Sequence, residues 1–241
     1  MDTRKQITTW VDTNREDLIE TANEIFKHPE VSLEEKVSSK ILADYLEKQG
    51  FTVTWGIAGF ETAFVAEWGY GKPVLGFLAE YDALPGLGQE TCSTRKAIEG
   101  PGHGCGHNLL GTACAGAAGA LKSWMETEEK EGTIRVYGCP AEEIVIGKIR
   151  MNEAGVFDDL SAAITWHPFD RNRVSYDIWQ AQDIKNYKFY GKAAHASKHP
   201  EMGRSALDAA ELMNVGVNYL REQWQMMYGC ITLIPIRMVR A

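Results

Sequence analysis

Positive charge is scarce in this sequence, which has 25 Lys and Arg residues against 33 Asp and Glu and a formal net charge of −8. Proteins that bind nucleic acid neutralise phosphates with clustered Lys and Arg, so we expect no nucleic-acid partner. Apolar runs of about 18 residues, the length that crosses a bilayer, are absent as well. The opening MDTRKQITTW lacks the apolar stretch of a secretory signal. We therefore expect a cytoplasmic protein without a membrane partner.

Cysteine is also sparse, and its odd number argues against a framework of disulfides. Three of the five thiols lie in Gly/Ala-rich or Pro-flanked segments, where reduced cysteines pack or bind metal. Apolar residues make up 44% of the chain and aromatic residues 10%, a composition that is typical of a globular core and not of disorder. The cysteines are Cys92, Cys105, Cys114, Cys139 and Cys230.

The hydrophobic periodicity predicts an α/β fold, a mostly parallel sheet flanked by helices. Apolar residues recur at helical spacing over 7–26 and 33–49, and a run rich in Gly and Ala predicts a closely packed, buried helix over 108–126. Short apolar runs between glycines predict strands. These strands are expected at 51–55, 63–68, 74–79, 133–138 and 162–166.

The character of the sequence changes after residue 171, and we place a domain boundary near Asp183. Residues 1–183 then form the first and larger domain. A strand over 184–190 and a helix over 205–222 cannot bury both of their faces alone, so residues 184–225 are expected to be the first part of a second, smaller α+β domain.

The densest group of reactive side chains is His103-Gly104-Cys105-Gly106-His107, immediately before a predicted helix. Zinc and similar ions take Cys sulfur and His nitrogen together, and glycine lets the backbone turn tightly around an ion. A catalytic thiol is the alternative, because a helix N-terminus lowers the pKa of a cysteine. A glycine-rich turn without chemistry is the third interpretation.

Three further polar groups follow predicted strands directly: Glu142 and Glu143 after one strand, His167 after another, and Asp82 after a third. Adjacent glutamates at a strand end point in different directions, so one can bind an ion while the other moves a proton. Asp82 would then orient a ligand histidine or cap the following turn. Paired glutamates on a solvated surface are the simpler alternative.

The motifs EYDALPG, HGCGHN, PAEE, WHP and GKAAHASKHPEMGRSALDAA occur here in one order, and in that order they resemble the zinc aminoacylase and amidohydrolase family of metallopeptidases. The resemblance extends to about Glu222. The Glu-Tyr-Asp form of the first motif and the Asn that ends the second are most similar to the members that act on p-aminobenzoyl-glutamate and on dipeptides.

The resemblance implies a role for each matching residue. Cys105, His107, Glu143 and His167 correspond to metal ligands, and Glu142 corresponds to the general acid and base. It also implies one or two zinc or manganese ions per chain and a small amide substrate: an N-acyl amino acid, a p-aminobenzoyl-glutamate-like compound or a dipeptide.

Two more residues acquire roles in the same way: Asp82 supports the metal site, and His195 reaches the substrate carbonyl of a partner subunit. The second domain of the family is a two-layer lid, inserted in the catalytic domain, through which subunits dimerise. The resemblance therefore implies a homodimer, or a dimer with a related subunit.

The chain departs from the family after the lid helix. Members are longer and supply a last ligand histidine near their C-terminus, whereas no histidine follows His199 here. Residues 226–241 do not match the strand expected there. Codons can be chosen for this tail that spell DVWVHYAYTDTDG in another reading frame, which suggests a frameshift. An inactive remnant with a metal-binding or structural role is thus the alternative to an amidohydrolase.

Overall fold

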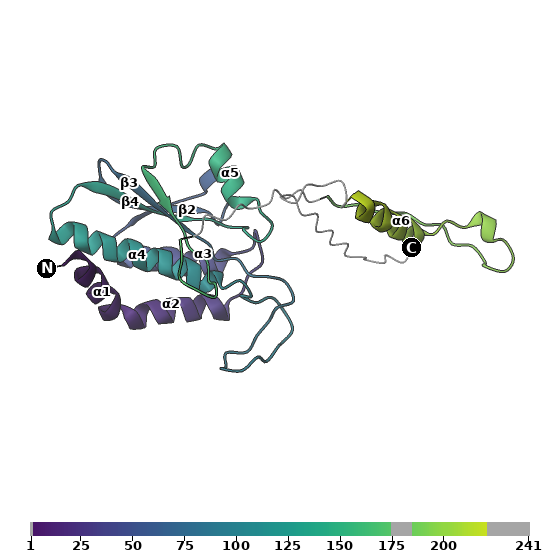
Figure 1. Ribbon diagram of the computed structural model, residues 1–241, viewed down its shortest axis with the longest axis horizontal. Coiled ribbons are helices and arrows are strands. Elements are labelled where there is room, and N and C mark those ends of the chain that lie inside the picture. Colours follow the sequence, from purple (N-terminus) through teal and green to yellow (C-terminus); the bar gives the residue numbers. More distant parts are fainter. Residues whose placement is uncertain (1, 175–184, 221–241) are drawn as a thin grey trace. The chain divides into compact units, whose positions relative to one another are not determined.

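The computed structural model describes residues 2–174 and 185–220, and it divides into two compact units, Met1–Arg171 and Asn172–Ala241 (Figure 1). The expected boundary near Asp183 and the tail 226–241 lie outside the described residues. Within them, no helix has the length and apolar character needed to span a membrane.

The first unit is built around a five-stranded sheet in the order β1-β2-β4-β3-β5. The pairs β1·β2 and β2·β4 are antiparallel, whereas β4·β3 and β3·β5 are parallel. The α/β fold with flanking helices is confirmed, and the parallel pairing is confined to the half of the sheet formed by β4, β3 and β5. The strands are β1 (Thr52–Trp55), β2 (Phe64–Tyr70), β3 (Val74–Ala79), β4 (Gly132–Gly138) and β5 (Ala162–Ile164).

Helices α3 and α4 pack on one face of this sheet, α1 and α2 pack in turn against α4, and α5 lies on the other face (Figure 1). The single helix expected over 7–26 is in fact two, because the chain breaks at Asn14, whose side-chain amide donates to the Trp10 carbonyl at 2.8 Å. The short helix α5 was not predicted. The helices are α1 (Thr3–Thr13), α2 (Arg15–Lys27), α3 (Lys36–Lys48), α4 (His107–Thr127) and α5 (Gly147–Glu153).

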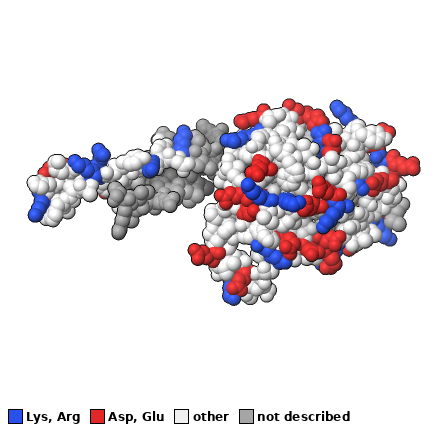
Figure 2. Space-filling view, turned by 180° about the vertical axis from the view of Figure 1, so that it is seen from behind, with Lys and Arg blue, Asp and Glu red and all other residues white. Residues whose placement is uncertain are grey.

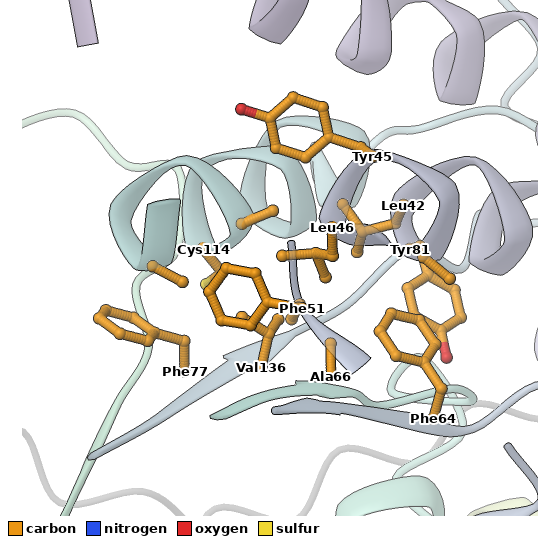
Figure 3. Close-up of a cluster of buried hydrophobic side chains, with 14 of the residues drawn as sticks. Leu42, Tyr45, Leu46, Phe51, Phe64, Ala66, Phe77, Tyr81, Cys114 and Val136 are labelled. Carbon is orange, nitrogen blue, oxygen red and sulfur yellow. The ribbon is translucent and has the colours of Figure 1, made fainter. Parts of the chain in front are cut away.

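Successive side chains of the strands point to opposite faces of the sheet and pack into two hydrophobic cores, one on each face. Phe77 and Val136 point into the larger core beneath α3 and α4 (Figure 3), while Leu78 and Tyr137 point to a smaller one that contains Met151 of α5. The sheet is therefore buried on both sides where its parallel strands end.

Helix α4 lies close against the end of β3, as its small residues predicted. A Cβ atom on Gly111 would lie 2.4 Å from the carbonyl oxygen of Glu80, so a larger residue there would push the helix away. This close approach brings the first residue of α4, His107, next to the residues that follow β3.

The second unit contains a 3₁₀ turn, η2 (Pro200–Met202), and α6 (Ala206–Tyr219). Ser205 caps α6 by accepting the Asp208 N–H at 3.0 Å. The expected strand over 184–190 is not formed at the described positions 185–190, and Ile184 lies outside them. A strand needs a paired neighbour, and the described part of this unit offers only the bridge of Lys192 with Arg204.

On the face shown in Figure 2, acidic and basic side chains are interspersed, and no continuous basic patch is seen there. This distribution agrees with the shortage of positive charge in the sequence.

Candidate metal centre

Polar side chains gather where the parallel strands end. Residues 80–82 follow β3, residues 139–143 follow β4, and His167 comes three residues after β5. Parallel strands place their carboxyl ends at one edge of a sheet, which is where ligands bind in α/β proteins. His107, at the start of α4, faces the same edge.

His107 is fully buried at the centre of this group. Its Nδ1 lies 2.9 Å from Asp82 Oδ1 and 3.1 Å from the Asp82 carbonyl oxygen. Both oxygens can only accept, so Nδ1 carries a hydrogen and Nε2 is the nitrogen left for a ligand. A carboxylate that orients a ligand histidine in this way is common in metal sites.

Carboxylates surround the other side of the imidazole ring. His107 Nε2 lies 3.1 Å from Glu80 Oε2, without hydrogen-bond geometry, and 3.8 Å from Glu142 Oε2. Two acceptors this close need a proton or a metal ion between them. Burial alone would lower the pKa of His107, but the Asp82 and Glu80 carboxylates raise it.

Three buried polar atoms of this group have no hydrogen-bond partner: Glu80 Oε2, His107 Nε2 and Glu143 Oε1. Buried atoms of this kind are costly to leave unpaired, and all three would be satisfied by one or two cations. The ligand atoms of Cys105, His107 and His167 lie within 4.8 Å of one another, as do those of Glu80, His107 and Glu142. Cys, His and Glu are also the donors that zinc takes in proteins, so the residues fit a divalent metal ion.

The two adjacent glutamates differ in exposure. The Glu142 side chain is 36% exposed, whereas that of Glu143 is 13% exposed and its backbone N–H donates to Asp82 Oδ2 at 2.9 Å. Burial and the neighbouring Glu80 raise the pKa of Glu142. Glu142 is therefore the glutamate that solvent can reach, and its raised pKa suits a group that takes up and releases a proton.

The expectation that the helix N-terminus lowers the pKa of Cys105 is wrong. Burial and the carboxylate of Glu143 raise the pKa of this thiol to about 12. Burial, together with the surrounding carboxylates, outweighs any effect of the helix dipole, so the neutral thiol is favoured in the absence of a cation. This result disfavours a catalytic thiol.

Two residues of the group were not singled out from the sequence. Glu80 stands in the EYDALPG motif, where a carboxylate two positions before Asp82 was a usable signal. Lys148 gave no signal, because it comes from α5, which was not predicted. Its Nζ makes a short ion pair with Glu80 Oε1, which orients that carboxylate beside His107.

His195 belongs to the second unit, where its Nδ1 accepts the Ser197 N–H at 3.3 Å. The structure brings together Asp82, Cys105, His107, Glu142, Glu143 and His167 of the predicted residues, all in the first unit.

Replacing Asp82 with Asn should weaken metal binding by about 10- to 100-fold, the usual effect of removing a carboxylate behind a ligand histidine. The amide retains an oxygen for the Nδ1–H of His107 but cannot also serve as a charged acceptor for Ser32 and Glu143. Titration of the metal-free protein with Zn²⁺ would measure the effect. The variant Asp44→Asn, at a surface carboxylate of α3 that pairs with Lys40, is the control, and equal affinity in both variants would contradict the role of Asp82.

An α/β sheet that brings Cys, His and Glu side chains together at the ends of its parallel strands defines a protein of the metallohydrolase type. The chain belongs to the peptidase family M20/M25/M40, whose family model matches residues 76–230. The resemblance of the five motifs is thereby confirmed.

The chain is 46% identical over 215 residues to one of the subunits of p-aminobenzoyl-glutamate hydrolase from Escherichia coli, a match that covers 88% of this chain and 45% of that protein. It is 32% identical over 229 residues to the human Xaa-Arg dipeptidase, covering 88% of this chain and 49% of that protein. The chain thus spans about half the length of these curated relatives.

A solved structure from Bacillus subtilis, described as a dinuclear metal-binding peptidase of the M20 family, matches with a TM-score of 0.54 and 28% identity. The match covers 63% of this chain and 42% of that one.

Proposed function

We propose that this chain supplies the site of a metal-dependent amidohydrolase that cleaves an N-acyl amino acid, a p-aminobenzoyl-glutamate-like compound or a dipeptide. The observation that carries the proposal is the convergence of Glu80, His107 and Glu143, each with a buried unpartnered atom, beside the solvent-accessible Glu142. The names of the similar hydrolase and dipeptidase support the class of substrate.

In this proposal Cys105, His107, Glu143 and His167 hold one or two zinc or manganese ions. A divalent ion bound there lowers the pKa of water and polarises a carbonyl group. Asp82 fixes the His107 ring through Nδ1, so that Nε2 faces the ligand position.

Glu142 acts as the general base and then as the general acid. Its carboxylate takes a proton from the attacking water and delivers it to the nitrogen of the departing amine, so no covalent enzyme intermediate is needed. The raised pKa of Glu142 assists the second step, because a more basic carboxylate retains the proton until the amine accepts it.

The second unit would contribute His195 as a hydrogen-bond donor to the substrate oxygen, in a neighbouring subunit, as the family resemblance implies. The similar Escherichia coli protein is named as a subunit, which supports an assembly of more than one chain. We accordingly propose that the chain works as a homodimer or with a related subunit.

The test is the metal content per chain of the purified protein. We expect one or two equivalents of zinc or manganese in the wild type, and less in both Cys105→Ala and His167→Ala. Plasma emission spectrometry after gel filtration would give the stoichiometry, with Cys92→Ala, an exposed thiol, as the control.

A folded wild-type protein that binds no metal would contradict the proposal. The chain would then be read as an inactive relative of these hydrolases. Metal binding without hydrolysis of p-aminobenzoyl-glutamate, N-acyl amino acids or dipeptides would leave a metal-binding role and remove the catalytic one.

A further inference from the structure

One buried carboxylate near the metal centre is not among its candidate ligands. Glu35 is fully buried just before α3, yet its side chain makes no cap for that helix. The helix amides of Val37 and Ser38 are instead bound by Glu30, at 2.9 and 2.8 Å. The Glu35 side chain is therefore turned into the protein for another purpose.

A single oxygen of Glu35 accepts two backbone N–H groups that are far apart in the sequence. Glu35 Oε1 lies 2.8 Å from the nitrogen of Leu33 and 2.8 Å from the nitrogen of Ala141, while Oε2 accepts the Thr62 hydroxyl at 3.2 Å. Burial raises the pKa of Glu35, against the opposing effect of these backbone hydrogen bonds. The carboxyl group is thus held as an acceptor at the junction of three segments.

Both N–H donors belong to residues with strained backbones. Leu33 has φ of 73° and Ala141 has φ of 56°, in the left-handed region that residues with a Cβ rarely occupy. Such conformations persist when the surrounding structure stabilises them, and they often occur at functional sites. The shared contact with Glu35 Oε1 is a stabilising interaction of this kind for both turns.

Each of the two turns carries part of the metal centre. Beside Leu33, the Ser32 hydroxyl donates to Asp82 Oδ2 at 2.8 Å, and the same oxygen accepts the Glu143 N–H. Ala141 immediately precedes Glu142 and Glu143. The two turns therefore share two hydrogen-bond acceptors: both donate to Glu35, and both donate to Asp82, which orients His107.

We propose that Glu35 is a positioning residue that locks both strained turns with one oxygen and so sets the places of Asp82, Glu142 and Glu143 at the metal centre. The proposal rests on the proposed metal site, and it assigns Glu35 no contact with metal or substrate. This role requires a hydrogen-bond acceptor at the end of a side chain as long as that of Glu; a negative charge is not needed.

Two variants separate the effect of side-chain length from the effect of charge. In Glu35→Gln the amide oxygen can accept both N–H groups and the amide nitrogen can donate to the Thr62 hydroxyl, whereas Glu35→Asp keeps the carboxylate but is one methylene shorter. We expect Glu35→Gln to bind Co²⁺ as the wild type does. Glu35→Asp should bind it about 10- to 100-fold more weakly, as expected when support behind metal ligands is lost. Titration with Co²⁺ alone, followed by absorption, would measure both affinities.

Amide hydrogen exchange, read residue by residue by NMR in the metal-free protein, tests the contact itself. The Leu33 and Ala141 amides should exchange slowly in the wild type and in Glu35→Gln, and both should speed up together in Glu35→Asp. Glu34→Gln, at the exposed neighbouring glutamate, is the matched control and should change nothing. Circular dichroism would show that each variant is folded.

Several outcomes would overturn the proposal: fast exchange of the wild-type Ala141 amide, wild-type Co²⁺ binding by a folded Glu35→Asp, or equal weakening in both variants. If Glu35→Asp does not fold, the wild-type and Glu35→Gln exchange rates still decide. If the wild type binds no Co²⁺, the metal part of the proposed function fails, and the exchange of Leu33 and Ala141 still tests Glu35 separately.

Discussion

Replacing His107 with Ala is expected to abolish metal binding and to destabilise the fold by about 3–5 kcal/mol, the range found when one partner of a buried charged pair is removed. His107 is fully buried between Asp82 on one side and Glu80 on the other, at 2.9 and 3.1 Å. Its removal leaves Asp82 Oδ1 and Glu80 Oε2, the oxygens that faced the ring, beside a cavity without the imidazole. Metal analysis and urea denaturation would measure the two effects.

His28→Ala is the control for this variant, because His28 is exposed and its ring bonds only to the Glu24 carbonyl among the contacts described. It should keep the metal content and most of the stability. A His107→Ala protein with wild-type metal content would show that the ion is held elsewhere, and the proposed ligand set would have to be abandoned.

Glu142→Gln should lower the rate of amide hydrolysis by about 10²- to 10⁴-fold, the usual contribution of a positioned general base. The amide side chain has nearly the same shape but cannot take a proton from water. Since Glu142 is not among the proposed metal ligands, metal content should stay at the wild-type level. Initial rates with p-aminobenzoyl-glutamate, N-acyl amino acids and dipeptides, measured beside metal analysis, would show whether catalysis and binding separate in this way.

The matched control is Glu153→Gln, an exposed glutamate in the last turn of α5. It should leave both quantities unchanged. Undiminished hydrolysis by Glu142→Gln would exclude the general base, and a simultaneous loss of activity in Cys105→Ser with full metal content would instead favour a thiol mechanism. The pKa of about 12 for Cys105 leads us to expect the opposite result.

Elements with a local signal could be predicted from the sequence. The apolar run over 74–79 coincides with β3, and the helix expected over 108–126 corresponds to α4. The prediction was wrong at two places where contacts override the apolar pattern. The helix expected over 7–26 is broken at Asn14, although its apolar pattern is continuous. The strand expected over 184–190 is not formed at the described positions, because no neighbouring strand pairs with it there.

The sequence by itself determined the chemical types at the site and their place in the chain order. Each proposed metal ligand lies beside a helix start or a strand end, and these local patterns can be recognised from the sequence alone. The ligands are Cys105, His107, Glu143 and His167. Parallel strands then bring their ends to one edge, so a common site was expected from the fold class alone.

Only the tertiary structure decided which groups face one another. Lys148 pairs with Glu80 across 68 positions of sequence, and Glu35 reaches Ala141 across 106. No periodicity or motif encodes such pairs, because they depend on the packing of helices against both faces of the sheet. The strained turns at Leu33 and Ala141 are stable only once that packing has placed a buried acceptor between them.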